Sequence, residues 1–114
     1  MLRPLLLVAL LATLAGCSRS PDVQSSVSNL EKSLAAAPDS PALKLAVAAV
    51  HTNEPGLGVV ALHEAKRMPG LSAEQLQAVE QASQAIVSDL VRRAADGDAR
   101  AKAQLEFIER SRSQ

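Results

Sequence analysis

Residues 72–95 read SAEQLQAVEQASQAIVSDLVRRAA, and this stretch decides the fold. Ser72 can cap the first turn of a helix, and Gln75, three residues later, completes the pattern of a capping box. Leu71 and Leu76 flank the box as a hydrophobic staple. Apolar and small side chains then recur at helical spacing, namely at Leu76, Val79, Ala82, Ser83, Ile86 and Leu90. The pattern predicts one helix about 36 Å long, against which the other segments can pack.

Two helices are predicted before this stretch. The first carries apolar residues spaced four, three and four apart, at Val23, Val27, Leu30 and Leu34. It ends before Pro38, because the residue that precedes a proline is pushed out of the helical region. Ser40 and Pro41 then open the second helix as a capping hydroxyl followed by a proline at the first helical position. The expected apolar face of that helix consists of Leu43, Val47 and Val50, widened by Leu45, Ala48 and Ala49.

Two more helices complete the prediction. One spans about 57–68, has Val60, Ala61 and Glu64 on successive turns, and stops at Pro69-Gly70. The other follows Asp96-Gly97-Asp98, which supplies a stop glycine and a new cap, and its apolar residues are Ala101, Leu105 and Ile108. No stretch shows the sustained alternation expected of a strand. We therefore expect a single all-α domain over 23–112, a small bundle or stack of antiparallel helical hairpins.

Part of this pattern is similar to a tetratricopeptide repeat. The small-residue rhythm of one such unit is matched by Leu45-Ala46, Ala49, Gly58, Leu62 and Ala65. The aromatic positions of the repeat are missing, and a proline stands at residue 69 rather than 70. Because a solenoid needs about three repeats to bury a core, the likeness is one of form only.

The composition excludes several classes of protein. The 114 residues include 12 Lys+Arg and 12 Asp+Glu, so the formal net charge is zero, whereas a nucleic-acid binder normally carries a basic excess. One Phe, with no Tyr or Trp, leaves no platform on which bases could stack. A single Cys cannot form an internal disulfide. We expect no nucleic acid among the partners.

The first 16 residues have the layout of a secretory signal peptide. Arg3 supplies a positive charge, and an apolar run of eleven residues follows at 5–15. This run is too short to cross a membrane, since a span needs roughly 20 apolar residues. We expect the segment to direct export.

The run ends in Leu14-Ala15-Gly16-Cys17, which resembles the lipobox of bacterial lipoprotein precursors. The resemblance implies that a signal peptidase recognises Leu14, Ala15 and Gly16 and cuts before Cys17. It also implies that Cys17 carries a diacylglycerol thioether and, in many bacteria, a further acyl chain such as palmitate on its amino group. Two or more chains hold a protein stably on a bilayer. The alternative is an ordinary signal peptide with an incidental cysteine.

We expect residues 17–22 to form the lipidated cysteine and a short polar tether. In lipoproteins of bacteria with two membranes, a serine such as Ser18 at this position resembles the signal that permits transfer to the outer membrane. Five extended residues reach at most about 18 Å, so we expect a lipidated chain to hold its domain near the headgroups, facing the periplasm.

The sequence offers few candidates for chemistry. His63-Glu64 begins like a zinc-protease motif, but Arg67 stands where the second histidine is required. His51 and His63 lie on opposite arms of one hairpin, so they can face each other with carboxylates nearby. Nothing in the sequence fixes that geometry, and we expect no metal, no cofactor and no catalytic residue.

Three functions fit these features. We favour a membrane-anchored, non-enzymatic interaction or accessory module of the cell envelope, similar to secretion pilots or assembly accessories, whose partner is another envelope protein. Its interaction surface would use Leu57, Val59 and Leu62, because the third predicted helix is apolar on more than one side. The alternatives are a small metal-dependent envelope hydrolase that uses His51 and His63, and a passive structural lipoprotein.

Overall fold

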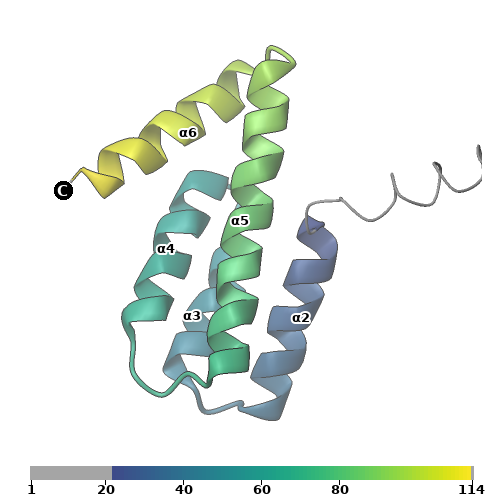
Figure 1. Ribbon diagram of the computed structural model, residues 1–114, viewed down its shortest axis with the longest axis vertical. Helices are drawn as coiled ribbons and strands as arrows, with labels where there is room; N and C mark the ends of the chain where they lie inside the picture. Colours follow the sequence, from purple (N-terminus) through teal and green to yellow (C-terminus); the bar gives the residue numbers. More distant parts are fainter. Residues whose placement is uncertain (1–21, 114) are drawn as a thin grey trace, which may run out of the picture.

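The computed structural model describes residues 22–113, and this part of the chain is all-α, as expected (Figure 1). Its helices are α2 (Val23–Ala36), α3 (Pro41–Val50), α4 (Pro55–Arg67), α5 (Ala73–Ala95) and α6 (Ala99–Arg112). The expected signal peptide at 1–16, the lipobox with Cys17, and Ser18 lie outside the described residues. The domain that the structure describes therefore tests the helical prediction and leaves the anchor as a prediction.

The long helix α5 begins where the sequence predicts. The Ser72 hydroxyl accepts a hydrogen bond from the Gln75 N–H at 3.1 Å, and the Gln75 side chain accepts one from the Ser72 N–H at 2.9 Å. This reciprocal pair satisfies two backbone donors that would otherwise have no partner at a helix start. The predicted capping box is confirmed.

The turn between α5 and α6 also forms as predicted. Gly97 has a φ of 97°, a conformation that a side chain disfavours, and it ends α5. One oxygen of Asp98 then accepts hydrogen bonds from the N–H groups of Arg100 and Ala101, while its other oxygen pairs with Arg93 on α5 at 3.0 Å. The backbone bond from Ala101 and the Arg93 guanidinium lower the pKa of the Asp98 carboxyl. The cap of α6 is therefore tied directly to the end of α5.

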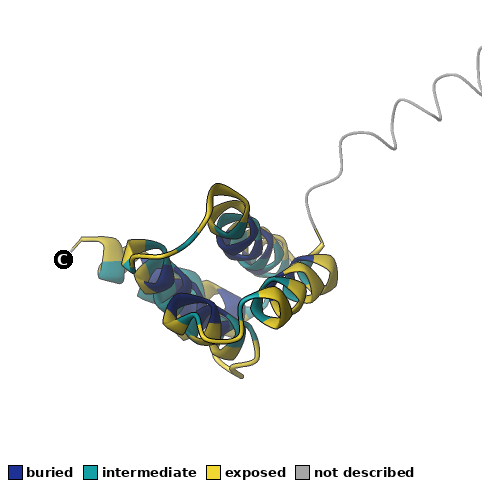
Figure 2. Ribbon diagram, turned by 90° about the horizontal axis from the view of Figure 1, so that it is seen from below, coloured by how far each residue is buried: buried dark blue, intermediate teal, exposed yellow. Residues whose placement is uncertain are grey.

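Helices α2 to α5 run alternately down and up, and α5 packs against both α2 and α4 (Figure 1). Helix α6 leaves the far end of α5 and runs obliquely back across α4. The N–H of Gly56, in the first turn of α4, donates to the Gln104 side chain of α6 at 2.7 Å. Seen along the bundle, the buried residues face inward and the exposed residues face outward (Figure 2). The last helix thus covers only one end of the bundle.

The core has two parts that share α4 and α5. The larger part lies among α2, α3, α4 and α5, and consists of Leu30, Ala46, Ala49, Leu62, Ala65, Ala78, Val79 and Ala82. The smaller part joins α4 and α5 to α6, and consists of Val59, Leu90, Ala101 and Ile108. Ile86 packs against both parts. Helices α4 and α5 therefore link the hairpins to α6.

The expected apolar faces of α3 and α4 were partly wrong. On α3 the buried residues are Ala42, Leu43, Ala46 and Ala49, whereas Val47 and Val50 are half-buried and Ala48 is exposed. On α4 the buried residues are Gly56, Gly58, Val59, Leu62 and Ala65, whereas Val60 and Ala61 are half-buried and Glu64 is exposed. One reason is that α4 approaches α3 closely at Gly58, where an added Cβ would lie 2.7 Å from the Ala49 carbonyl oxygen, so small residues occupy this contact.

A similar correction applies to α5. Leu76, expected on the apolar stripe, is 41% exposed, while Ala78 and Ala85, which the expected stripe does not include, are buried. Val79, Ala82, Ser83 and Leu90 are buried as predicted. The buried face of α5 is thus centred on alanines.

The contact between α3 and α4 predicts the effect of a single methyl group. A Cβ added at Gly58 would lie 2.7 Å from the Ala49 carbonyl oxygen, which cannot rotate away because it belongs to the backbone. We expect Gly58→Ala to lower the free energy of unfolding by about 1–3 kcal/mol, measured by urea denaturation. Gly56→Ala is the comparison, because its closest obstacle is a side-chain end, that of Gln104, which can move at the cost of its hydrogen bond to the Gly56 N–H. An equal or smaller loss for Gly58→Ala would contradict the close approach.

Candidate functional site

The two histidines contact different helices. His51 caps the end of α3, and its Nε2 lies 2.9 Å from the Glu31 Oε1 of α2. His63 lies on α4, and its Nε2 is 3.3 Å from the Ser83 hydroxyl of α5. The facing pair that a metal-dependent hydrolase would use is therefore not assembled. Within residues 22–113, no group of three or more His, Cys, Asp or Glu side chains could hold a metal ion.

The surface expected at Leu57, Val59 and Leu62 is also corrected. Val59 and Leu62 are completely buried, one in each part of the core, while Leu57 is 47% exposed. A buried side chain cannot contact a partner without unfolding the helix that carries it. Of these three residues, only Leu57 is available at the surface.

The structure places a different set of residues around a cleft between α4 and α6, with a volume of about 270 Å³. We call this the α4–α6 cleft. It is lined from α4 by Val60, His63, Glu64 and Arg67, and from α6 by Ile108, Ser111 and Arg112. The cleft exists because α6 crosses α4 obliquely, so that the two helices separate toward the C-terminal end of each (Figure 1).

The electrostatic environment of the cleft is positive. Partial burial lowers the pKa of His63, and the nearby charges of Lys66, Arg112 and Arg67 lower it further, while Glu80 acts in the opposite direction. Lys66 is paired with Glu80 of α5, and the hydrogen bond from Lys66 lowers the pKa of the Glu80 carboxyl. His63 is therefore held toward its neutral form.

The two arginines of the cleft are weakly engaged. Arg67 lies 3.6 Å from the Glu64 carboxylate, and both side chains are largely exposed, so this ion pair contributes little. Among the described residues, no carboxylate lies within ion-pair distance of Arg112, and its guanidinium makes no hydrogen bond. Within residues 22–113, neither guanidinium is held in a close ion pair.

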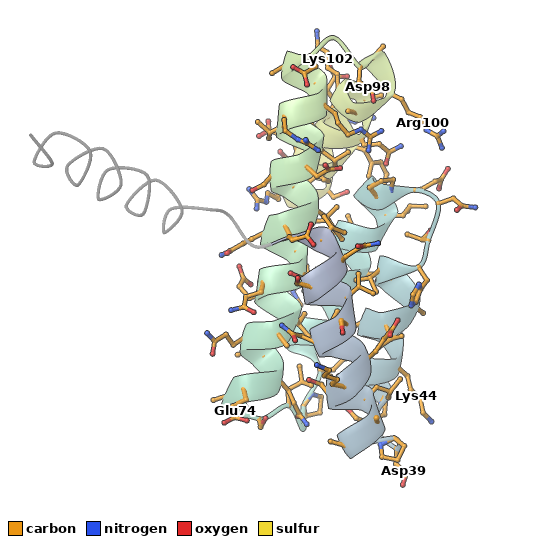
Figure 3. All side chains as sticks on the ribbon, turned by 90° about the vertical axis from the view of Figure 1, so that its right-hand side faces the viewer. Asp39, Lys44, Glu74, Asp98, Arg100 and Lys102 are labelled. Atoms are coloured by element: carbon orange, nitrogen blue, oxygen red, sulfur yellow. The ribbon has the colours of Figure 1, made fainter. Side chains whose placement is uncertain are left out.

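Elsewhere the surface charges are mixed. Figure 3 shows Asp98, Arg100 and Lys102 gathered at the end that carries the α5–α6 turn, and Asp39, Lys44 and Glu74 at the opposite end. A wider groove of about 610 Å³ runs along α5 beside Leu76 and Gln77. Its charged side chains, Lys66 and Glu80, neutralise each other. The charges of that groove are therefore balanced, whereas the α4–α6 cleft contains two arginines and one carboxylate.

Sequence reasoning missed this cleft. His63 and Arg67 are four residues apart on one helix, a spacing that places them on the same face and could have drawn attention to them. However, Ser111 and Arg112 lie beyond Ile108, the last residue of the expected apolar pattern, whereas α6 continues to Arg112. The crossing of α6 over α4 is needed to bring the two sets together.

Comparison with known proteins does not assign the chain to a family. The chain matches no protein-family model, no curated protein and no solved structure. Among the described helices, none is both long enough and apolar enough to cross a membrane.

Two leucines on α4, Leu62 and Leu57, differ in how far they are buried. We expect Leu62→Ala to lower the free energy of unfolding by about 2–5 kcal/mol, because it removes a completely buried side chain and leaves a cavity. Leu57→Ala is the matched control and should change the stability by about 0.5 kcal/mol or less. Urea denaturation measures both values. Similar losses for the two variants would show that the core is assigned incorrectly.

The positive environment of His63 predicts a pH effect. The NMR titration of its ring should give a pKa below 6.5, and Arg112→Gln should raise that pKa while Arg110→Gln on the same helix leaves it unchanged. Because the unfolded chain binds this proton at a higher pH than the folded chain, the stabilising contribution is present above the unfolded pKa. It is lost as the pH falls through the folded pKa.

Urea denaturation at several pH values between about 7 and 5 tests the same point. The free energy of unfolding should fall less steeply toward acid in His63→Gln than in the wild type. A His63 pKa at or above 6.5 would refute the proposed environment.

Proposed function

We propose that this protein is a lipid-anchored, non-enzymatic module of the bacterial cell envelope, which holds a small helical domain at a membrane and binds another envelope protein. The observation that carries the proposal is Leu14-Ala15-Gly16-Cys17 at the end of an eleven-residue apolar run. Four residues match the lipobox at the correct place after a positively charged start.

The lipobox residues have distinct roles in this proposal. Ala15 and Gly16 are small, so the backbone can enter a narrow peptidase groove, and the Cys17 thiolate is the nucleophile that takes the lipid. Removal of residues 1–16 leaves a diacylglycerol thioether on Cys17 and a free amino group for palmitate. With two or more acyl chains, attachment to the bilayer is stable. Ser18 favours an outer-membrane location with the domain facing the periplasm.

The helical domain suits a position at the membrane surface. Its core is closed by its own helices, and its large exposed apolar residues are Leu57, Leu76 and Val91, on separate turns of α4 and α5. Scattered exposed apolar residues are normal on a protein surrounded by water. The arginines of the α4–α6 cleft offer a polar contact for a partner, which supports a binding role more than a purely passive one.

Metabolic labelling tests the anchor. Cells that express the full chain are grown with radiolabelled palmitate, and the chain is isolated after membrane fractionation. We expect the wild type to carry label and to remain with the outer-membrane fraction, because Cys17 is the site of lipidation. The control is Cys17→Ser, which keeps the apolar run but removes the thiol.

The proposal predicts that Cys17→Ser carries no label and leaves the membrane fraction or accumulates as the uncut precursor. Two results would overturn it. One is a wild-type chain without label, and the other is equal label in both proteins.

A further inference from the structure

We propose that the α4–α6 cleft binds a carboxylate side chain on an acidic, partly apolar segment of the partner protein, with the Arg67 and Arg112 guanidinium groups as its ligands. This inference rests on the proposed function and specifies the chemistry of its partner. It is carried by the placement of two arginines from separate helices around one cleft, which also has an apolar portion formed by Val60 and Ile108.

The arginines have the chemistry that a carboxylate requires. A guanidinium presents a planar set of N–H donors that matches the two oxygens of a carboxylate, and such charge-assisted bonds are stronger than neutral ones. Arg112 meets no carboxylate within the part of the chain that the structure describes, and the contact of Arg67 with Glu64 is long and exposed. Neither group must break a strong ion pair in order to bind.

The charge balance of the cleft favours a singly charged ligand. Two arginines and the Glu64 carboxylate leave one net positive charge when His63 is neutral, the form that its lowered pKa favours, and Lys66 is paired with Glu80. One carboxylate neutralises this charge. A doubly charged phosphate would leave an excess of negative charge beside Glu64, so the balance disfavours phosphate.

The size and lining of the cleft favour a side chain that is part of a longer segment. Its volume of about 270 Å³ is below the range of roughly 300–1,000 Å³ in which proteins enclose whole small molecules. Val60 and Ile108 give it an apolar portion beside the arginines. The Ser111 hydroxyl donates to the Phe107 carbonyl at 3.0 Å, so its proton is already used. An acidic residue with an apolar neighbour therefore fits the volume and the apolar portion of the cleft. Its carboxylate would bind the arginines rather than the Ser111 hydroxyl.

A direct binding measurement tests the inference. The full chain, purified in a nonionic detergent, is titrated into a fluorescein-labelled, end-capped peptide of alternating glutamate and leucine, and fluorescence anisotropy is recorded. We expect saturable binding by the wild type. Arg112→Gln and Arg67→Gln should each weaken it by about tenfold, since each removes a charge-assisted contact.

The matched control is Arg110→Gln, which removes the same charge from α6 but not from the cleft. It should change the affinity by less than about twofold, as expected of a solvent-exposed charge. Circular dichroism confirms that each variant is folded. A second readout locates the peptide: its binding should raise the pKa of the His63 ring in the NMR titration, because a carboxylate then lies nearby.

Four results would overturn the inference: no binding by the wild type, equal weakening by Arg110→Gln and Arg112→Gln, equal binding of a peptide with glutamine in place of glutamate, or displacement of the peptide by inorganic phosphate at similar concentration. The palmitate experiment is independent of these outcomes. A labelled chain that does not bind the peptide refutes this inference alone, whereas a chain that binds the peptide but takes no label refutes the anchor.

Discussion

The close packing of helices through small side chains is the constraint on which this structure depends. Helix α5 buries alanines at 78, 82 and 85, and α3 buries alanines at 42, 46 and 49. Because alanine loses no side-chain rotamer freedom on burial, these contacts carry little entropic cost, but each buries only a small apolar area. Larger side chains, such as Leu30, Leu62 and Leu90, fill the core between these alanine contacts. The fold therefore relies on precise helix spacing more than on a few bulky residues.

The same constraint explains what the sequence could and could not predict. Helix ends were predictable, because the chemistry of a cap is local: Ser72 with Gln75, and Gly97 with Asp98, act within a few residues. Helix faces were less predictable, because periodicity gives most weight to large apolar residues. Leu76 was placed in the core on that basis and is exposed, while Gly58 lies at the centre of a contact. The packing of one backbone against another, rather than side-chain size, decides which face is buried.

The candidate site could not be predicted from the sequence, for a related reason. Its α4 and α6 residues are more than 40 positions apart, and they meet only because the Asp98 cap fixes the start of α6 at the end of α5. The pair of histidines shows the converse. His51 and His63 are near each other in the chain, but they turn toward α2 and α5, respectively. Proximity in the sequence was therefore a poor guide to which polar side chains share a site.

Because the chain is nearly neutral overall, the charged groups of the cleft are important for the selection of a partner. With 12 basic and 12 acidic residues, the protein has no strong overall attraction for anionic lipids or for acidic proteins at a distance. Exposed charges are also screened beyond about 10 Å at moderate ionic strength. Selection of a partner must then come from short-range contacts, where a guanidinium can bind a carboxylate directly. A tether of a few residues would keep such a cleft close to the bilayer, so in our proposal the anchor determines where the protein acts and the arginines determine what it binds.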